Sequence, residues 1–248
     1  MMVGGGERIL VAAALGQFIG LALVREFPEA TVHVADGKSA VELAVSGRVR
    51  FDVVVSDLTW NDHATAFTFD GLDVLDILRQ AQRAAPVILA TQGHGMELDY
   101  LDESAERAEV AGIYCKATGL GPLFEAVRIA IGGGKLPADR FPWGDSPPGI
   151  PRIHRYFGRG RGLTAARMAG AIASGRAVNR STLARAAVVS HFTAARLVDY
   201  LGPLIVGRGE HDSDLKMTAE VIYRWCGEHR RYILSWCRRK GFLGTADQ

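Results

Sequence analysis

The first 131 residues alternate short apolar runs with amphipathic segments, and this alternation limits the fold more than any other feature of the chain. The strand-like runs are residues 8–13, 30–35, 51–57, 86–91 and 111–116, and the helical segments are 16–28, 37–47, 71–84, one near 103–109, and 121–133. Repeated βα units form an open parallel sheet with helices on both faces. We therefore predict a five-stranded, doubly wound α/β domain over residues 1–133. In its first helix we expect Phe18, Leu21, Leu23 and Val24 on the buried side.

Composition divides the chain at a segment rich in glycine and proline. Residues 134–162 repeatedly interrupt helical and strand periodicity, so we predict a linker there and a second domain at 163–248. Residues 1–150 contain 12 Lys and Arg against 20 Asp and Glu, a net charge of −8, whereas residues 151–248 contain 17 against 7, a net charge of +10. An acidic half joined to a basic half predicts two domains with different partners, and the basic one can approach nucleic acid.

Composition also disfavours several classes of protein. Of the 248 residues, 48% are hydrophobic and 23% are charged, values typical of globular proteins. The sequence lacks a run of about 18 apolar residues and a signal-peptide pattern, so we expect a cytoplasmic protein without a membrane partner. Cys115, Cys226 and Cys237 are too few and too scattered for a disulfide framework or a zinc site. None of the seven histidines has a convincing metal or nucleophile spacing, so we expect no enzyme, no cofactor and no metal.

Three polar side chains end predicted strands that are otherwise apolar. Asp57 ends the run at 51–57, Thr91 ends the run at 86–91, and Lys116 ends the run at 111–116. The carboxyl ends of parallel strands share one edge of the sheet, where such folds place their ligand sites. A carboxylate, a hydroxyl and an ammonium gathered there can bind, transfer or sense a phosphoryl group. A rim of unrelated, solvated polar residues is the alternative interpretation.

Residues 8–131 resemble the receiver domains of bacterial two-component response regulators. The resemblance rests on the stretches "RILVAA", "ADGKSAVELA", "FDVVVSD", "DGLDVLDILR", "PVILAT" and "AGIYCKA". It implies a flavodoxin-like fold, with Asp57 at the phosphoacceptor position. It further implies that Thr91 is the switch hydroxyl and that Lys116 is the lysine that contacts the acyl phosphate.

The chain departs from the receiver pattern where receivers bind magnesium. The two acidic residues that the resemblance places at the end of the first strand are Ala13 and Ala14 here, and alanine offers no oxygen to a hard cation. Without the ion, the charge that develops on the phosphoryl oxygens loses its main counter-charge. The position of the switch aromatic holds Ile113, and Tyr114 is displaced by one residue, which on a strand means the opposite face. We therefore predict an atypical receiver that ordinary aspartyl phosphorylation does not regulate.

The segment that follows Asp57 is longer than in typical receivers and contains several aromatic residues. Its ionisable residues that could approach the site are Asp62, His63 and Asp70. Trp60, Phe67 and Phe69 could cap a pocket for an apolar small molecule, and a protein ligand could act on the receiver instead. The simpler alternative is that these aromatics pack the segment against the domain.

The second domain has the pattern of a small helical DNA-binding module. We predict helices at about 163–175, 179–189 and 190–205, the third with Ser190 as its N-cap. Residues on the buried face of this third helix are Ala194, Leu197, Val198 and Leu201. Two short helices that meet through a tight turn describe a helix-turn-helix, whose second helix can enter the major groove.

Eight residues of this module are candidate DNA contacts. They are Arg176, Arg180, Arg185, Ser190, His191, Phe192, Thr193 and Arg196. The start of the recognition helix usually lies closest to the bases, and Arg196 can read guanine or bind phosphate. The module resembles the LuxR-type output domain in its opening "LT", its "ASG" ahead of Asn179, its "LAR" and its Ser190-x-x-Thr193. The resemblance implies binding to double-stranded promoter DNA, and the symmetry of most DNA sites predicts a homodimer.

A long helix is predicted at about 217–240, after a polar loop. It carries Trp225 and Trp236, which we expect to complete the helix-turn-helix core, and a dimer contact is the alternative. The function predicted for the whole chain is a DNA-binding transcriptional regulator with an atypical receiver. Two other classes remain open: an RNA-binding antiterminator, and a protein-interaction adaptor controlled by the receiver.

Overall fold

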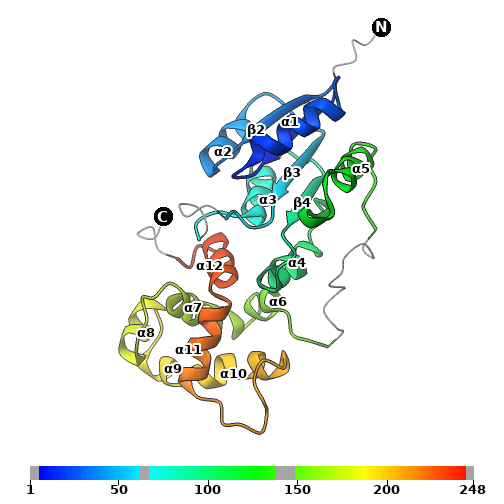
Figure 1. The fold of residues 1–248 in the computed structure, drawn as a ribbon. Coiled ribbons are helices and arrows are strands. Elements are labelled where there is room, and N and C mark those ends of the chain that lie inside the picture. The colour runs from blue at the N-terminus through cyan, green and yellow to red at the C-terminus, as the bar shows by residue number, and fades with distance from the viewer. Residues whose placement is uncertain (1–5, 62–66, 138–148, 244–248) are drawn as a thin grey trace. The chain divides into compact units, whose positions relative to one another are not determined.

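The computed structural model describes residues 6–61, 67–137 and 149–243 (Figure 1). The chain forms two compact units, Met1–Gly144 and Asp145–Gln248. Within the described ranges, no helix is both long and apolar enough to cross a bilayer. The three cysteines are free, and burial raises the pKa of the Cys226 and Cys237 thiols. These two thiols are therefore protonated packing residues.

Five parallel strands form the sheet of the first unit. They are β1 (Arg8–Ala12), β2 (Thr31–Ala35), β3 (Val53–Asp57), β4 (Val87–Thr91) and β5 (Val110–Cys115). Their order is β2-β1-β3-β4-β5, which is the flavodoxin-like order of doubly wound folds. Every residue of β3 and β4 is buried, because helices cover both faces of the sheet, and this explains their continuous apolar sequences. The five predicted strands and the α/β fold class are confirmed.

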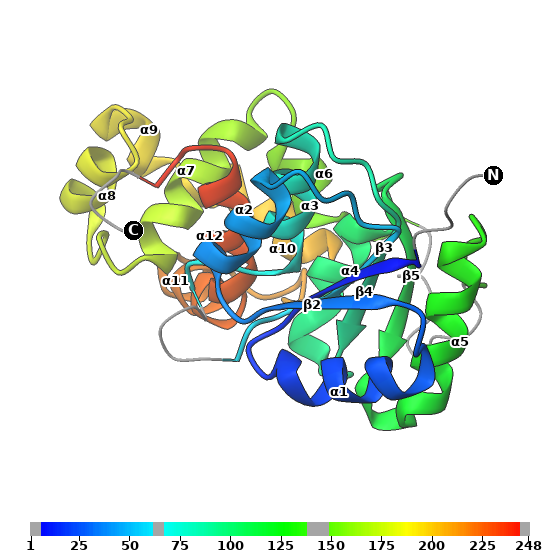
Figure 2. The same ribbon diagram turned by 90° about the horizontal axis from the view of Figure 1, so that it is seen from above.

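Helices alternate with these strands. They are α1 (Gly16–Glu26), α2 (Lys38–Ser46), α3 (Gly71–Gln80), α4 (Leu98–Ser104) and α5 (Leu120–Ile131), with short 3-10 turns η1 (Gly95–Glu97) and η2 (Lys116–Thr118). Figure 2 shows α1 and α5 on one side of the sheet and α2 and α3 on the other. The helix expected near 103–109 begins earlier, so this prediction was wrong in position. Tyr100 and Ser104, one helical turn apart, are among its four buried residues (1% and 0% exposed).

The buried face of α1 also differs from the prediction. Leu23 is buried as expected, but Phe18, Leu21 and Val24 are 74%, 71% and 50% exposed. The face toward the sheet is formed by Gly16 and Gly20, where an added Cβ would lie only 2.8 and 2.7 Å from the Val34 side chain. Because these glycines bring the helix backbone close to β2, the larger apolar residues turn outward. Together with Leu15 (71% exposed) they form an apolar stripe on the surface of this unit.

The second unit is entirely helical in its described part. Its helices are α6 (Ile153–Phe157), α7 (Gly162–Ala173), α8 (Arg180–Ala186), α9 (His191–Ala195), α10 (Leu197–Gly207), α11 (Ala219–Glu228) and α12 (Arg230–Arg239). Most of α7 is buried, including Met168, Ala169 and Ile172, and it contacts α6, α8, α10, α11 and α12. Only Leu163 and Arg167 of this helix are exposed, and a helix that is buried over most of its surface lies inside its domain. Thus α7 is the central element around which the other helices pack.

The long helix expected at 217–240 is two helices that join at His229, so that prediction was wrong. His229 leaves the helical conformation (φ −93°, ψ 12°), and its Nε2 lies 3.3 Å from Glu210 Oε2. The same carboxylate accepts a hydrogen bond from Trp225 Nε1 at 2.5 Å and one from Arg208 Nε at 3.0 Å. Burial raises the pKa of Glu210, but hydrogen bonds from these three side chains outweigh burial and lower the pKa to about 2. The loop carboxylate therefore stays charged and fixes the junction between the helices.

Part of the expected linker, 134–162, is folded into the second unit. Ile153 and Phe157 of α6 are 1% and 0% exposed, and the Tyr156 hydroxyl donates to the carbonyl oxygen of Tyr200 at 2.7 Å. A short helix with two buried side chains is a packed element, since a flexible linker leaves its side chains in solvent. Two other aromatic residues of this segment, Phe141 and Trp143, lie outside the described residues.

Candidate functional site

Asp57 and Lys116 meet at the carboxyl edge of the sheet. Asp57 is the last residue of β3, and Lys116 follows β5 directly. The Lys116 Nζ lies 2.6 Å from Asp57 Oδ1, and the two side chains are 23% and 8% exposed. The opposite charges of two strand ends that are far apart in the sequence are therefore paired, as expected from the parallel topology.

The environment of Asp57 disfavours its charged form. Burial raises the pKa of Asp57, the ion pair with Lys116 lowers it, and the nearby charge of Glu97 raises it again. The resulting pKa lies above the ordinary value for aspartate. A carboxylate in such a place depends on its cationic partner, because few water molecules can solvate it.

The residues at this edge do not fit a magnesium ion. At the end of β1, Ala13 is buried and Ala14 is half-buried, and neither supplies an oxygen ligand. Asp57 Oδ1 is already paired with the Lys116 ammonium. Among the described residues, no group of three or more His, Cys, Asp or Glu side chains is arranged to hold a metal.

A third ionisable residue, Glu97, occupies this edge and was not predicted. It ends η1 and is only 1% exposed. Its Oε1 accepts a hydrogen bond from the Thr59 hydroxyl at 2.7 Å, and its Oε2 accepts one from the Thr91 hydroxyl at 2.6 Å. Three successive backbone N–H groups, those of residues 92, 93 and 94, also donate to Oε2 at 3.0, 3.0 and 3.2 Å. The hydroxyl that the resemblance identifies as the switch, Thr91, is thus committed to Glu97.

The aromatic residues after β3 pack against the unit. Trp60 and Phe69 are 0% and 1% exposed and contact each other edge to face, with ring centroids 4.9 Å apart. Phe67 is 45% exposed. Asp70 caps α3 by accepting hydrogen bonds from the N–H groups of residues 72 and 73, and this explains its place in the sequence. Two residues predicted to approach the site, Asp62 and His63, lie outside the described residues.

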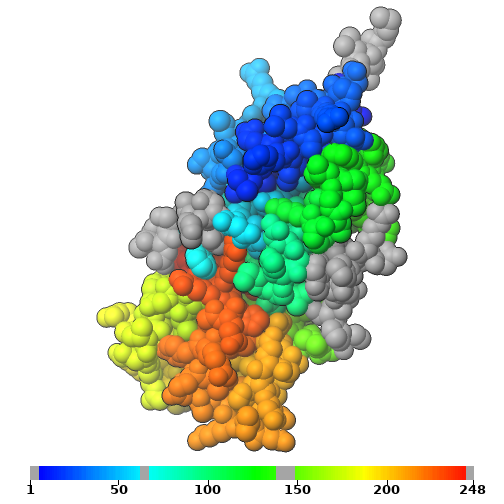
Figure 3. Space-filling view, in the orientation of Figure 1, coloured from blue at the N-terminus to red at the C-terminus, as the bar shows by residue number. Residues whose placement is uncertain are grey.

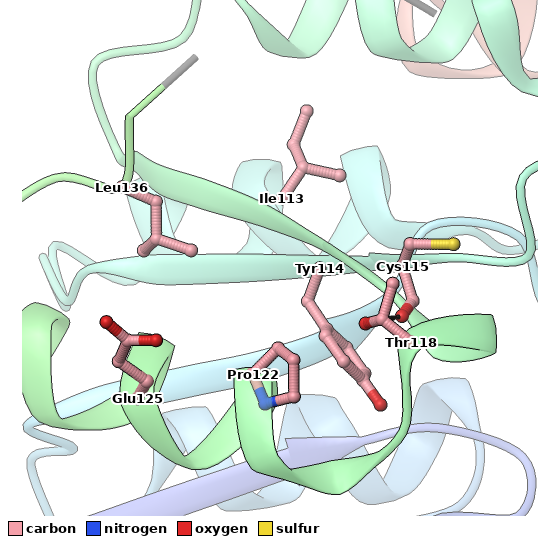
Figure 4. Close-up of a pocket in the computed structure, with 7 residues that line it drawn as sticks. All are labelled: Ile113, Tyr114, Cys115, Thr118, Pro122, Glu125 and Leu136. Carbon is pink, nitrogen blue, oxygen red and sulfur yellow. Dashed lines mark hydrogen bonds between the residues drawn. The ribbon is translucent and has the colours of Figure 1, made fainter. Parts of the chain in front are cut away.

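Ile113 and Tyr114 point to opposite sides of β5, as strand geometry requires (Figure 4). Tyr114 is 5% exposed, packs in the core cluster with Leu123, and donates from its hydroxyl to the Gly119 carbonyl at 2.8 Å. A pocket of about 410 Å³ lies beside this strand, lined by Ile113, Tyr114, Cys115, Thr118, Pro122, Glu125 and Leu136 (Figure 4). Asp57 and Trp60 do not line it, so this cavity differs from the expected pocket above Asp57.

The second candidate site is the pair of helices α8 and α9. Asn179 caps α8 by accepting a hydrogen bond from the Thr182 N–H at 3.0 Å, and Ser190 caps α9 by accepting one from the Thr193 N–H at 3.0 Å. Residues 187–190 form the tight turn between them, where Val188 has a positive φ of 53°. Such a backbone is strained for a β-branched residue. In Figure 3 this part of the chain is the yellow-green surface beside the orange α11.

Three of the four residues predicted on the buried face of the recognition helix are buried, Val198 is half-buried, and the helix is interrupted. Ala194, Leu197 and Leu201 are 3%, 4% and 0% exposed. Arg196 separates α9 from α10 with φ −97° and ψ 23°. The expected single helix is therefore a five-residue helix followed by α10, which also contains Pro203.

Some of the candidate DNA-contacting side chains bond to neighbouring side chains in this structure. Arg196 Nε lies 2.8 Å from Asp199 Oδ2, and Arg176 Nε donates to Ser174 Oγ at 3.0 Å. Ser190 Oγ and Thr193 Oγ1 are 2.9 Å apart and bond to each other. Three other candidates, Arg180, Arg185 and His191, are exposed, and their side chains form no hydrogen bond or ion pair with another described residue. Phe192 is 72% exposed at the start of α9, and the Arg196 guanidinium lies 5.8 Å from its ring centroid.

Comparisons with known proteins give matches only among solved structures. No family model matches the chain, and no curated protein matches it. The receiver domain of the Francisella response regulator 1452 is 20% identical, with a TM-score of 0.40, and the match covers 51% of this chain and 98% of that one. The Salmonella typhimurium response regulator RcsB is 13% identical with a TM-score of 0.43, and the RcsB–DNA complex is 11% identical with a TM-score of 0.48. Both RcsB matches cover 90% of this chain and 98% of the other. The solved structures named here, to which the chain is similar, are thus those of response regulators.

Proposed function

We propose that this chain is a DNA-binding transcriptional regulator of the response-regulator type. The observation that carries the proposal is the pair α8 and α9, two capped short helices joined by a tight turn. They lie in a part of the chain, residues 151–248, whose net charge is +10. Arg180, Arg185 and His191 are exposed on this pair, where basic side chains can contact phosphate and bases.

The experiment that tests this function is selection of binding sites by the full-length chain from a randomised duplex DNA library, at about physiological salt. Enrichment of a two-fold symmetric sequence is the expected result, because a dimer presents two copies of α9. A preference for hairpin RNA would instead support an antiterminator. Absence of any salt-dependent nucleic-acid affinity would support a protein-interaction adaptor, and either result would contradict the proposal.

Replacing Arg180 or Arg185 with alanine is expected to weaken binding to all duplex sequences by a similar factor. Each variant would lose one phosphate contact, so the magnitude of the slope of log affinity against log salt concentration should fall by about one. Fluorescence anisotropy across a salt series measures this slope. Arg224→Ala is the matched control, because Arg224 is exposed on α11, outside the helix pair. An equal effect of Arg224→Ala would show that net charge alone is responsible.

The regulatory part of the proposal is that aspartyl phosphorylation is not the ordinary input. Ala13 and Ala14 supply no metal ligand, Lys116 is paired with Asp57, and the Glu97 carboxylate is nearby. A phosphoryl group on Asp57 would add about two negative charges close to that carboxylate. A small molecule or a protein that binds the receiver is the alternative input.

Incubation of the full-length chain with magnesium and a small acyl phosphate is expected to leave Asp57 unlabelled, as measured by intact-protein mass spectrometry. The physical reason is the missing counter-charge for the transferred phosphoryl group. Ala14→Asp is the informative variant, because it returns one oxygen ligand to the end of β1, and labelling should increase in it. Robust labelling of the unaltered chain would contradict this part of the proposal.

A further inference from the structure

Glu97 is a heavily hydrogen-bonded ionisable side chain of the first unit, and it lies away from solvent. It is 1% exposed, and five donors converge on its two oxygens at distances between 2.6 and 3.2 Å. A buried charge is stable only when hydrogen bonds or a counter-charge replace its water. The donors therefore form a shell that replaces water around one carboxylate group.

The five donors belong to three separate segments of the chain. Thr59 follows β3, Thr91 ends β4, and the three backbone N–H groups belong to the loop after β4. Gly93 in this loop has a φ of 86°, a left-handed conformation that turns neighbouring N–H groups toward one point. Successive N–H groups in such a turn form a concave anion-binding nest.

We propose that this nest, with the hydroxyls of Thr59 and Thr91, is a binding site for small oxyanions, and that the Glu97 carboxylate is its built-in ligand. The site would accept a carboxylate or phosphate group, because all of its recorded contacts donate hydrogen bonds and its occupant is an anion. Glu97 excludes external anions as long as its side chain stays in place. Removal of that side chain opens the site.

The regulatory meaning of this site rests on the proposed function, whereas its chemistry does not. Glu97 holds the Thr91 hydroxyl and the loop after β4 in an anion-bound arrangement without any phosphoryl group on Asp57. Its charge also raises the pKa of Asp57 and opposes further negative charge there. The state of the receiver is then changed by displacing Glu97, and an added phosphoryl group is not required.

The test is hydrogen exchange of the amides of residues 92–94 in the full-length chain and in Glu97→Ala. In the variant the N–H groups of residues 92 and 94 lose the Glu97 acceptor, whereas the Gly93 N–H keeps its second acceptor, Thr91 Oγ1 at 3.0 Å. The amides of residues 92 and 94 should therefore exchange at least about tenfold faster, since hydrogen bonds to a charged group contribute about 1.5–3 kcal/mol. Sodium formate at about 0.1 M should restore slow exchange in Glu97→Ala, and sodium chloride at the same ionic strength should not. Formate supplies the carboxylate that the alanine lacks.

Two further variants keep the test decisive. Glu103→Ala removes another buried carboxylate of the same unit (Glu103 is 9% exposed) while Glu97 and its donors remain, so exchange at residues 92–94 should not respond to formate. Glu97→Gln keeps the side-chain volume and one acceptor oxygen but loses the charge, so exchange should accelerate less than in Glu97→Ala, and formate should not slow it because the amide still fills the site. Protection that persists in Glu97→Ala, or exchange that formate does not slow, would overturn the proposal. Failure to bind DNA would leave these results unchanged and would reject only the proposed function.

Discussion

Replacing Trp236 with alanine is expected to lower the free energy of unfolding of the second unit by about 4 kcal/mol, as large aromatic deletions in a core do. Trp236 is 2% exposed on α12. Its ring contacts Phe157 and Phe242 edge to face, with centroids 5.3 and 5.8 Å away. Since α12 packs against the central helix α7, the cavity would open beside the most buried element of the unit.

Hydrogen exchange of the α7 amides in the full-length chain measures this loss, because these amides exchange mainly when the unit opens. A loss of about 4 kcal/mol corresponds to roughly a thousandfold faster exchange. Trp236→Phe retains an aromatic ring and should lose much less, and the amides of β3 in the first unit serve as an internal reference. Unchanged protection of α7 together with weaker self-association would place Trp236 in a dimer contact, the alternative that the sequence left open.

The sheet could be predicted because each strand has a local signal that burial enforces. β3 and β4 are covered on both faces, so their sequences are continuous apolar runs, and no long-range information is needed to recognise them. The face of α1 could not be predicted in this way. Gly16 and Gly20 carry no hydrophobic signal, yet they form the contact with Val34, and the apolar residues that a periodicity argument places inside are exposed.

Breaks in helices depend on contacts that periodicity does not encode. Residues 217–240 have helical periodicity on both sides of His229. The helix nevertheless ends there, because His229 and Trp225 both bind Glu210. Glu210 lies in the preceding loop, so the periodicity of residues 217–240 gives no sign of these contacts. The edge of the sheet shows the same difference. Asp57 and Lys116 end strands, so topology alone brings them together, whereas Glu97 follows a loop and its donors come from separate segments.

Replacing Lys116 with methionine is expected to lower the free energy of unfolding of the first unit by about 3 kcal/mol at neutral pH, the lower end of the cost of leaving one buried charge unpaired. Asp57, whose side chain is 8% exposed in the unaltered chain, would lose the cation 2.6 Å away. Methionine fills a similar volume and keeps the apolar part of the side chain. Exchange of the β3 amides, measured in the full-length chain, reports this opening free energy.

The pH dependence of this variant identifies Asp57 as the cause. In the unaltered chain the pKa of Asp57 is already raised above its ordinary value of 3.8. Protonation of Asp57 therefore stabilises the folded state below pH 3.8. This stabilisation is lost as pH rises through the pKa of Asp57 in the folded state. Removing Lys116 removes a cause that lowers this pKa, and the pKa rises further. The loss of unfolding free energy in Lys116→Met should therefore be complete above the raised pKa and shrink as pH falls through it, because a protonated carboxyl needs no cation.

Adding Asp57→Asn to Lys116→Met should recover most of the lost stability at neutral pH, since no buried charge remains unpaired. A cost that stays constant with pH and persists in the double variant would instead come from lost packing of the lysine side chain.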